Sequence, residues 1–361
     1  MNVINRKSSY LALFLVFLCA LNALFAVDTD SSWGINLAYY LDDNKGGSGG
    51  SNRFLPPCYV PKSYANSAAW QNGPIGGDPL NLEANATRKL GNGWGSLEFE
   101  VYYRFRAVFP LLQGDGLYKD NNLTLIVKPV ISPVSFHVET EAQWTPIAFA
   151  KLLLGASGGT GWPLHILGAE GQALNNMDNI DNVPRSGWVE TYFLGTTLQF
   201  DLAALVPGKW NHVVFSATAK AQYYNNSMAK DKDAWYWRAN SGQTFNGWEY
   251  RGDYAIGYQP PWKVNFIGIV AEHRFYLSEK IRNMSTIASN GWGSDLQKWR
   301  FGPAMKVDLA NGIGLTVLLQ FANGLYYTEE TSYARWFQRW ETTQDEYIKI
   351  DRLVLQYSKK F

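Results

Sequence analysis

The chain has 361 residues, and its 32 Lys and Arg nearly balance its 31 Asp and Glu. A net charge of +1 provides no basic surface of the kind that nucleic-acid binding requires, so we expect no nucleic-acid partner. Aromatic residues make up 15% of the chain, with 15 Trp and 21 Tyr.

The first 26 residues have the pattern of a secretory signal peptide. Two basic residues, Arg6 and Lys7, precede an apolar run that ends near Phe25, and this run is too short for a transmembrane helix. A lipid-modified Cys19 is the alternative, although the bulky Leu18 before it does not fit that signal. Removal of residues 1–26 takes away two of the 32 basic residues and leaves 30 against 31 acidic ones. We therefore expect one domain, residues 27–361, which has a single cysteine and cannot depend on an internal disulfide.

Apolar and polar residues alternate with a period of two along most of this domain, which predicts an all-β fold. We expect twelve strands, at 31–41, 80–90, 95–109, 122–131, 133–154, 188–202, 210–224, 247–259, 264–278, 297–309, 313–327 and 346–360.

The connections between these segments alternate in length. Five are tight turns rich in Gly, Pro and Asn, such as "SP" at 132–133 and "ANG" at 310–312. The six others, including 110–121 and 155–187, are longer. A secreted β-sandwich has no reason to keep this alternation, whereas short periplasmic turns and long extracellular loops characterise outer-membrane barrels. The sequence thus predicts a closed antiparallel transmembrane β-barrel of about 12 strands (10–14) in contact with lipid.

Tryptophans at the ends of the predicted strands support this interpretation. Trp33, Trp94, Trp210 and Trp262 lie beside one set of strand ends, and Trp188, Trp248 and Trp299 lie beside the other. Amphipathic rings prefer the headgroup level of a bilayer, so the positions predict two aromatic girdles.

The stretch "SLEFEVYYRFRAVF" at 96–109 shows what each face of a strand would contact. Leu97, Phe99 and the residues in phase with them are apolar and should face lipid, whereas Glu98 and Arg104 belong to the other face. The same phase on the other strands predicts a charged lumen lined by Glu98, Glu100, Arg104, Arg106, His137, Glu139, Glu141, Lys220, Glu249, Arg251, Asp253, Glu272 and Arg274.

The chain ends "DRLVLQYSKKF", with Tyr357 and Phe361 in the phase of an apolar face. This ending resembles the C-terminal signature of Gram-negative outer-membrane proteins, although Lys359 departs from its usual apolar residue. The resemblance implies that the barrel-assembly machinery reads Tyr357 and Phe361 and that the protein lies in the outer membrane of a diderm bacterium. It indicates a class of porin-like proteins and no specific family.

Two functions remain open for such a barrel. Charges inside it could line a water-filled channel for passive uptake of small hydrophilic solutes, or they could pair into a plug and leave adhesion or ligand binding to the loops. Loop 225–246, with Trp235, Tyr236 and Trp237, could contact sugars or proteins or could cap the barrel mouth.

Enzymatic activity is not expected. His137 with Glu139 and Glu141 could bind a divalent metal, but a pairing cluster in the lumen explains the same residues. Lipid hydrolysis by an outward-facing His273 would need a local His-x-Ser motif, which the sequence lacks. The glycine run 155–161 has no P-loop Lys and is expected in a flexible loop, so we predict no cofactor and no metal.

Overall fold

In the computed structural model of the chain, the residues described are 28–40, 96–162, 165–166, 169–170, 172–175, 187–229, 234–237, 244–284, 286–289, 293–329 and 340–361. The predicted signal peptide, the predicted strand 80–90 and Trp94 lie outside them. The division into signal peptide and mature domain therefore stays a prediction.

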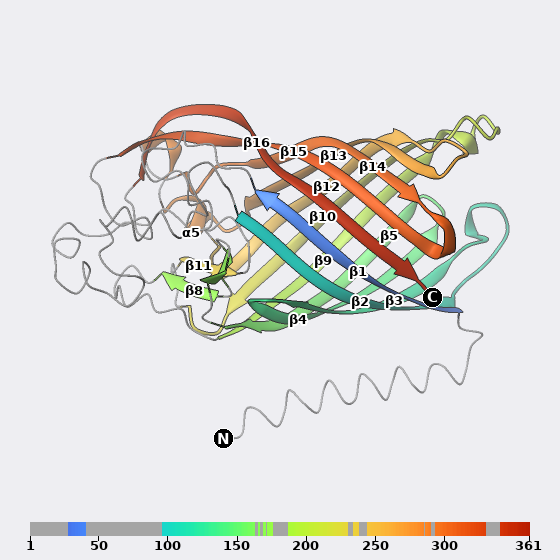
Figure 1. The fold of residues 1–361 in the computed structure, drawn as a ribbon, viewed down its shortest axis with the longest axis horizontal. Helices are drawn as coiled ribbons and strands as arrows, with labels where there is room; N and C mark the ends of the chain where they lie inside the picture. Colours follow the sequence, from blue (N-terminus) through green and yellow to red (C-terminus); the bar gives the residue numbers. More distant parts are fainter. Residues whose placement is uncertain are drawn as a thin grey trace, which may run out of the picture.

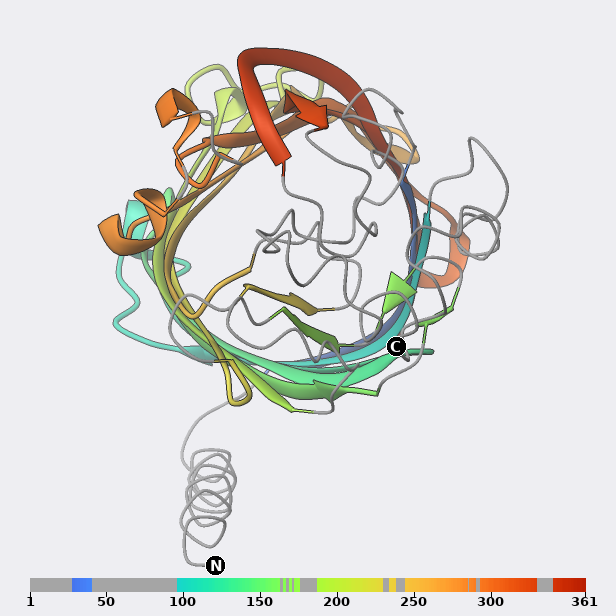
Figure 2. The ribbon, with the colours of Figure 1, turned by 90° about the vertical axis from the view of Figure 1, so that its left-hand side faces the viewer.

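Twelve antiparallel strands form a closed barrel, tilted against its long axis (Figures 1 and 2). They are β1 (Asp28–Tyr40), β2 (Ser96–Pro110), β3 (Asn122–Ser132), β4 (Ser135–Ile147), β5 (Ala150–Gly161), β9 (Trp188–Asp201), β10 (Val213–Asn226), β12 (Gly247–Tyr258), β13 (Val264–Tyr276), β14 (Lys298–Asp308), β15 (Ile313–Glu329) and β16 (Trp340–Lys360). Each pairs with its neighbour in this order, and β16 pairs with β1 to close the ring. The predicted fold class and strand number are confirmed.

The remaining elements are short. They are the strands β6 (His165–Ile166), β7 (Ala169–Glu170), β8 (Gln172–Asn175) and β11 (Ala234–Trp237), the helix α5 (Glu279–Arg282), and 3-10 turns at Gly116–Tyr118, Leu202–Ala204, Ile287–Ser289 and Ala310–Gly312. Within the described part of the chain, no helix has the length and apolar character needed to cross a membrane.

The outer wall of the barrel is apolar, as the alternating pattern predicts. Phe99, Tyr103 and Phe105 on β2 are exposed, whereas Glu100 and Tyr102 between them are buried. Leu152, Leu154, Tyr192, Leu194, Leu198, Phe200, Ile256, Ile267 and Ile269 continue this exposed apolar surface over β5, β9, β12 and β13. In a closed barrel every backbone group can pair between strands, so this surface can face hydrocarbon. The chain is an outer-membrane-type β-barrel.

Aromatic side chains mark both ends of the wall. Trp188, Trp248 and Trp299 are exposed at the first or second residue of β9, β12 and β14. At the opposite end Trp210 packs edge-on against Trp262, with ring centroids 5.5 Å apart. Rings at these levels match the headgroup regions of a bilayer.

The C-terminal strand holds the barrel closed through its pairing with β1. Tyr357 is paired with Ile35 and packs its ring 5.3 Å from that of Trp33, and the amide of Phe361 donates to Ser31 O at 3.0 Å. The side chain of Phe361 is exposed. Recognition of Tyr357 and Phe361 by the assembly machinery stays a prediction.

The two ends of the barrel differ. One end, here called the turn end, carries the start of β1, the C-terminus and the connections 111–121, 148–149, 202–212, 259–263 and 309–312 (Figure 1). The other, the loop end, carries the connections 41–95, 133–134, 162–187, 227–246, 277–297 and 330–339. The predicted contrast between short turns and long loops holds for 227–246 and 277–297 against 259–263 and 309–312. It does not hold for 202–212, which has 11 residues at the turn end, whereas 330–339 has 10 at the loop end.

Two of the predicted connections lie at the wrong end. Because β2 pairs with β1 directly, it runs from the loop end to the turn end. Connection 111–121 therefore belongs to the turn end, not to the long loops, and the turn Pro133–Val134 belongs to the loop end.

The predicted single strand 133–154 is also wrong, since it is two strands joined by Ala148 and Phe149. The paired register shifts between Trp144 and Ile147, where Pro146 has no amide to donate to a ladder. Neither Ala148 nor Phe149 is a typical turn residue, so composition did not indicate the hairpin.

The glycine run 155–161 is part of strand β5, not a flexible loop. A Cβ at Gly155 would lie 2.2 Å from the ring of Phe193, and one at Gly159 would lie 2.3 Å from Cβ of His137. These glycines are needed because larger neighbouring side chains lie directly against the β5 backbone.

Candidate functional site: the lumen

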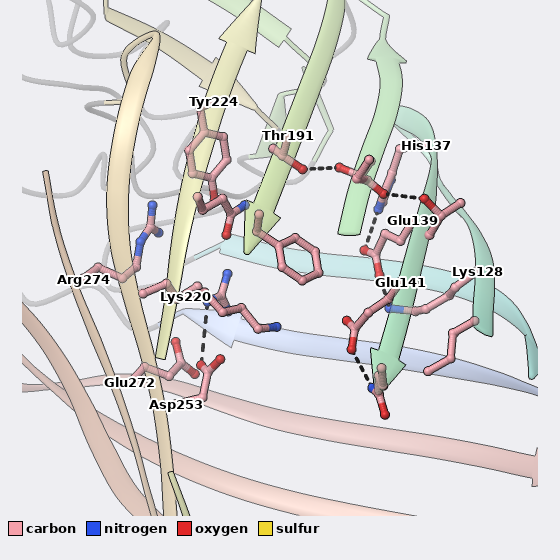
Figure 3. A pocket seen from close by; sticks show the side chains of 18 of the residues that line it. Lys128, His137, Glu139, Glu141, Thr191, Lys220, Tyr224, Asp253, Glu272 and Arg274 are labelled. Atoms are coloured by element: carbon pink, nitrogen blue, oxygen red, sulfur yellow. Dashed lines mark hydrogen bonds and ion pairs between the residues drawn. The ribbon is translucent and has the colours of Figure 1, made fainter. Parts of the chain in front are cut away.

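The barrel encloses a cavity of about 600 Å³ whose wall is mainly polar. Its basic residues are Arg104, Lys128, Lys220, Arg251, Arg274, Arg300 and Arg352, and its acidic residues are Glu98, Glu139, Glu141, Asp253 and Glu272. Figure 3 shows that the labelled side chains enter the cavity from opposite sides, with Glu139 and Glu141 facing Lys220 and Arg274. The inward phase of the strands thus creates a charged interior.

A network of ion pairs covers the wall formed by β13 to β16. Glu272 on β13 lies 2.7 Å from Arg352 Nη2 on β16 and 3.7 Å from Arg300 Nη1 on β14. Arg300 Nε in turn lies 2.9 Å from Asp351 Oδ2. The amide of Gln320, which is fully buried, donates to Glu272 at 2.9 Å and accepts from Arg352 at 2.5 Å. Two cations and two carboxylates therefore balance each other within one hydrogen-bonded unit.

A β-bulge in β16 makes this network possible. The paired register of β15 and β16 shifts between Gln320 and Phe321, so that Arg352 pairs with Gln320 while Ile350 pairs with Phe321. The extra residue is Asp351. A bulge places two successive side chains on nearly the same face, and Asp351 is accordingly buried beside Arg300 although simple alternation would point it to lipid.

The opposite wall, β2 to β4, carries a smaller cluster. Lys128 Nζ lies 2.9 Å from Glu139 Oε2, and His137 Nε2 lies 3.0 Å from Glu139 Oε1. Gln143 donates to Glu141 at 2.5 Å. Among the residues that the structure describes, no group of three or more His, Cys, Asp and Glu side chains is placed to hold a metal ion. The geometry of His137 and Glu139 is that of a pairing cluster.

The wall of β9, β10 and β12 connects these clusters. Arg251 Nε lies 3.6 Å from Asp253 Oδ1. The ammonium of Lys220 lies 4.6 Å from the ring centroid of Phe193, a distance typical of a cation–π contact. Phe193 also lines the cavity and adds an apolar surface to a polar interior.

Ten of the thirteen predicted lumen residues line the cavity, namely Glu98, Arg104, His137, Glu139, Glu141, Lys220, Arg251, Asp253, Glu272 and Arg274. The other three lie elsewhere on the inward phase. Glu100 is buried in the wall, Glu249 is buried in an ion pair with Arg274, and Arg106 pairs with Asp30 at 3.3 Å toward the turn end.

The predicted set omitted several residues that belong to the site. Lys128 and Arg352 line the cavity, and both could have been found from alternation, because each shares its phase with other inward residues of its strand. Gln320 and Asp351 could not be recognised in the same way, since the first looks like an ordinary polar strand residue and the second depends on the bulge.

Strand β11, part of the connection 227–246, lies at the loop-end mouth. Trp235 on β11 is fully buried against Val189 and Tyr224, and its ring N–H donates to Asn246 Oδ1 at 3.1 Å. The small sheet of β8 and β11 lies within the outline of the barrel when viewed from the loop end (Figure 2). Trp235 is therefore not available for contact with sugars, and its role as a cap of the barrel mouth stays a prediction.

His273 faces outward in an aromatic cluster. Its ring stacks on Trp299 with centroids 3.9 Å apart and an interplanar angle of 4°, and Nε2 lies 3.2 Å from Gln297 Oε1. The sequence around it runs "EHRFYL", without the serine that the hydrolase hypothesis requires.

Comparisons with known proteins agree with the fold at low similarity. No family model matches the chain, and no curated protein matches it. Among solved structures, the chain is similar to an outer-membrane channel from Pseudomonas putida F1, with 10% identity and a TM-score of 0.37 over 93% of this chain and 97% of that one. It is also similar to the KdgM porin, with 8% identity and a TM-score of 0.31 over 73% of this chain and 95% of that one. A third similar structure is LpxR from Salmonella typhimurium, with 10% identity and a TM-score of 0.36 over 91% of this chain and 99% of that one.

Proposed function

We propose that this protein is an outer-membrane channel for passive passage of small hydrophilic solutes. The proposal rests on where the ion pairs lie inside the barrel. Glu272 pairs with Arg300 and Arg352 along the β13 to β16 wall, and Lys128 pairs with Glu139 along the β3 to β4 wall. These pairs follow the wall on each side of a cavity of about 600 Å³.

Charged side chains inside a barrel require either partners or water. Twelve strands enclose more space than the roughly eight whose side chains fill a barrel, and less than the sixteen to eighteen of open porins. A hydrated path through a charged lumen accounts for both the charges and the cavity. The polar wall favours hydrophilic solutes, and the absence of a catalytic constellation in the described lumen favours transport over catalysis.

A liposome swelling experiment tests this function. Purified protein refolded into liposomes should admit uncharged sugars at rates that fall steeply with sugar size, because the barrel encloses less space than that of open porins. Liposomes made with heat-denatured protein provide the background. Swelling no faster than this background, from protein shown to be folded in the liposomes, would support the plugged-barrel alternative instead.

A further inference from the structure

Four cationic residues occupy directly paired positions on four consecutive strands. Lys220 on β10 is paired with Arg251 on β12. Arg251 is also paired with Arg274 on β13, which is paired with Lys298 on β14. Like charges directly opposite each other destabilise a sheet, so an uninterrupted row of four, here called the cationic row, requires an explanation.

Two carboxylates form ion pairs with members of the cationic row. Glu249 pairs with Arg274, and Asp253 lies 3.6 Å from Arg251. The next cations along the wall, Arg300 and Arg352, are balanced by their own carboxylates in the β13 to β16 network. Lys220 and Arg251 line the cavity, and Asp253 is the one carboxylate of the described residues that forms an ion pair with either of them.

Lys220 and Arg251, two of the three members of the row that line the cavity, retain donors for a ligand. None of the described carboxylates lies within ion-pair range of Lys220, whose contact is the face of Phe193. Arg251 forms one loose ion pair through Nε and no hydrogen bond with another described residue. Both side chains line the cavity, and Figure 3 shows Lys220 extending into it from β10.

We propose that Lys220 and Arg251 form a binding site for small organic anions, so that the channel selects carboxylate-bearing solutes. This inference rests on the proposed channel function and names its substrate class. The planar guanidinium of Arg251 suits a carboxylate, since its donors form a fork. Lys220 adds a second charge, and the ring of Phe193 offers an apolar surface to the carbon skeleton.

Succinate and 1,4-butanediol provide a matched pair of probes, because both have four carbons and one of them is uncharged. In planar bilayers, succinate should interrupt the single-channel current at concentrations where butanediol does not. The double variant Lys220→Gln/Arg251→Gln should raise the half-blocking succinate concentration at least about tenfold, since it removes two charge-assisted contacts.

Lys306→Gln serves as the control, because it removes a lumen-side charge from β14 that lies outside the cavity lining. It should change the half-blocking concentration less than about twofold, as expected for an exposed charge. Without succinate the double variant should unfold at the same or a higher temperature than the wild type, because like-charge repulsion has been removed. Loss of block would then not reflect misfolding.

Failure of this proposal can be distinguished from failure of the channel. A conducting wild type that responds equally to both probes, or a double variant that is blocked like the wild type, would overturn the anion site alone. If the wild type does not conduct, thermal unfolding in detergent still tests the site. If succinate raises the unfolding temperature of the wild type but not of the double variant, the anion site is supported. If succinate does not raise the unfolding temperature of the wild type, the anion site is rejected.

Discussion

Glu272 on β13 and Arg352 on β16 are joined across two intervening strands, with Arg352 Nη2 2.7 Å from Glu272 Oε1. Both side chains are less than one-fifth exposed, at 18% for Glu272 and 16% for Arg352. The contact connects the closing strand β16 to β13, at the other side of the β13 to β16 wall. It therefore links the charge arrangement of the lumen to the stability of the barrel.

Neutralising Glu272 should destabilise the protein. Glu272→Gln leaves Arg300 and Arg352 without a shared carboxylate. We expect a loss of about 2–3 kcal/mol, which is less than for one partner of a fully buried ion pair because these side chains are partly exposed. The unfolding temperature in detergent measures this. The exposed Asp345 on β16 provides the control, and Asp345→Asn should have little effect. An equal response of the two variants would show that the network does not stabilise the barrel.

Surface labelling should distinguish the observed topology from the one that alternation of connection lengths predicts. In a Cys58→Ser background, Pro133→Cys lies at the loop end and should react with a membrane-impermeant maleimide on intact cells. Gln113→Cys lies at the turn end, with the start of β1 and the C-terminus, and should react after the outer membrane is opened. Reaction of Gln113→Cys on intact cells, with Pro133→Cys protected, would contradict this topology in the membrane.

The sequence was most informative where one face of a strand meets lipid. Alternation along 96–109 placed Phe99 and Tyr103 outside and Arg104 inside because each face meets a different solvent. The strand number was predicted correctly, although β4 and β5 were predicted as one strand. The predicted strand 80–90 lies outside the described residues.

The remaining features depend on contacts distant in sequence. The hairpin at Ala148 and Phe149 has no turn residues, and its single local sign is Pro146. Asp351 enters the lumen network through a bulge defined by the register with β15. Trp235 is buried because Val189 and Tyr224 of other segments enclose it. None of these relationships follows from periodicity alone.

A charge on the outer wall should impair membrane insertion, whereas the same charge inside should not. Leu194 lies near the middle of β9 and is 61% exposed on the outer wall. Leu194→Arg should cost about 2–4 kcal/mol, as Arg does near the midplane of such barrels. Ser216→Arg, on the inward phase of β10, is the control. Gel mobility before and after heating reports the folded fraction. If both variants lose the same folded fraction, the assignment of strand faces to lipid and lumen is wrong.

Removing the cap should widen the mouth without unfolding the barrel. Trp235→Ala deletes a fully buried ring, and truncation of a buried Trp costs about 3–5 kcal/mol locally. We expect larger single-channel conductance and faster proteolysis within 227–246, with an unchanged unfolding temperature of the barrel. Trp210→Ala, at the turn end, should leave conductance unchanged. A cooperative loss of barrel stability in Trp235→Ala would contradict the role of Trp235 as a cap.

Single-channel recording in planar bilayers tests the central claim most directly. Refolded wild-type protein should produce discrete current steps. In a KCl gradient across the bilayer, the sign of the reversal potential should indicate a preference for anions, because seven basic and five acidic residues line the cavity. This preference should weaken as the salt concentration rises, because the screening length falls to about 3 Å at 1 M. Protein that is folded by its heat-dependent gel mobility but produces no current steps would contradict the channel, and the charges of the lumen would then be a plug.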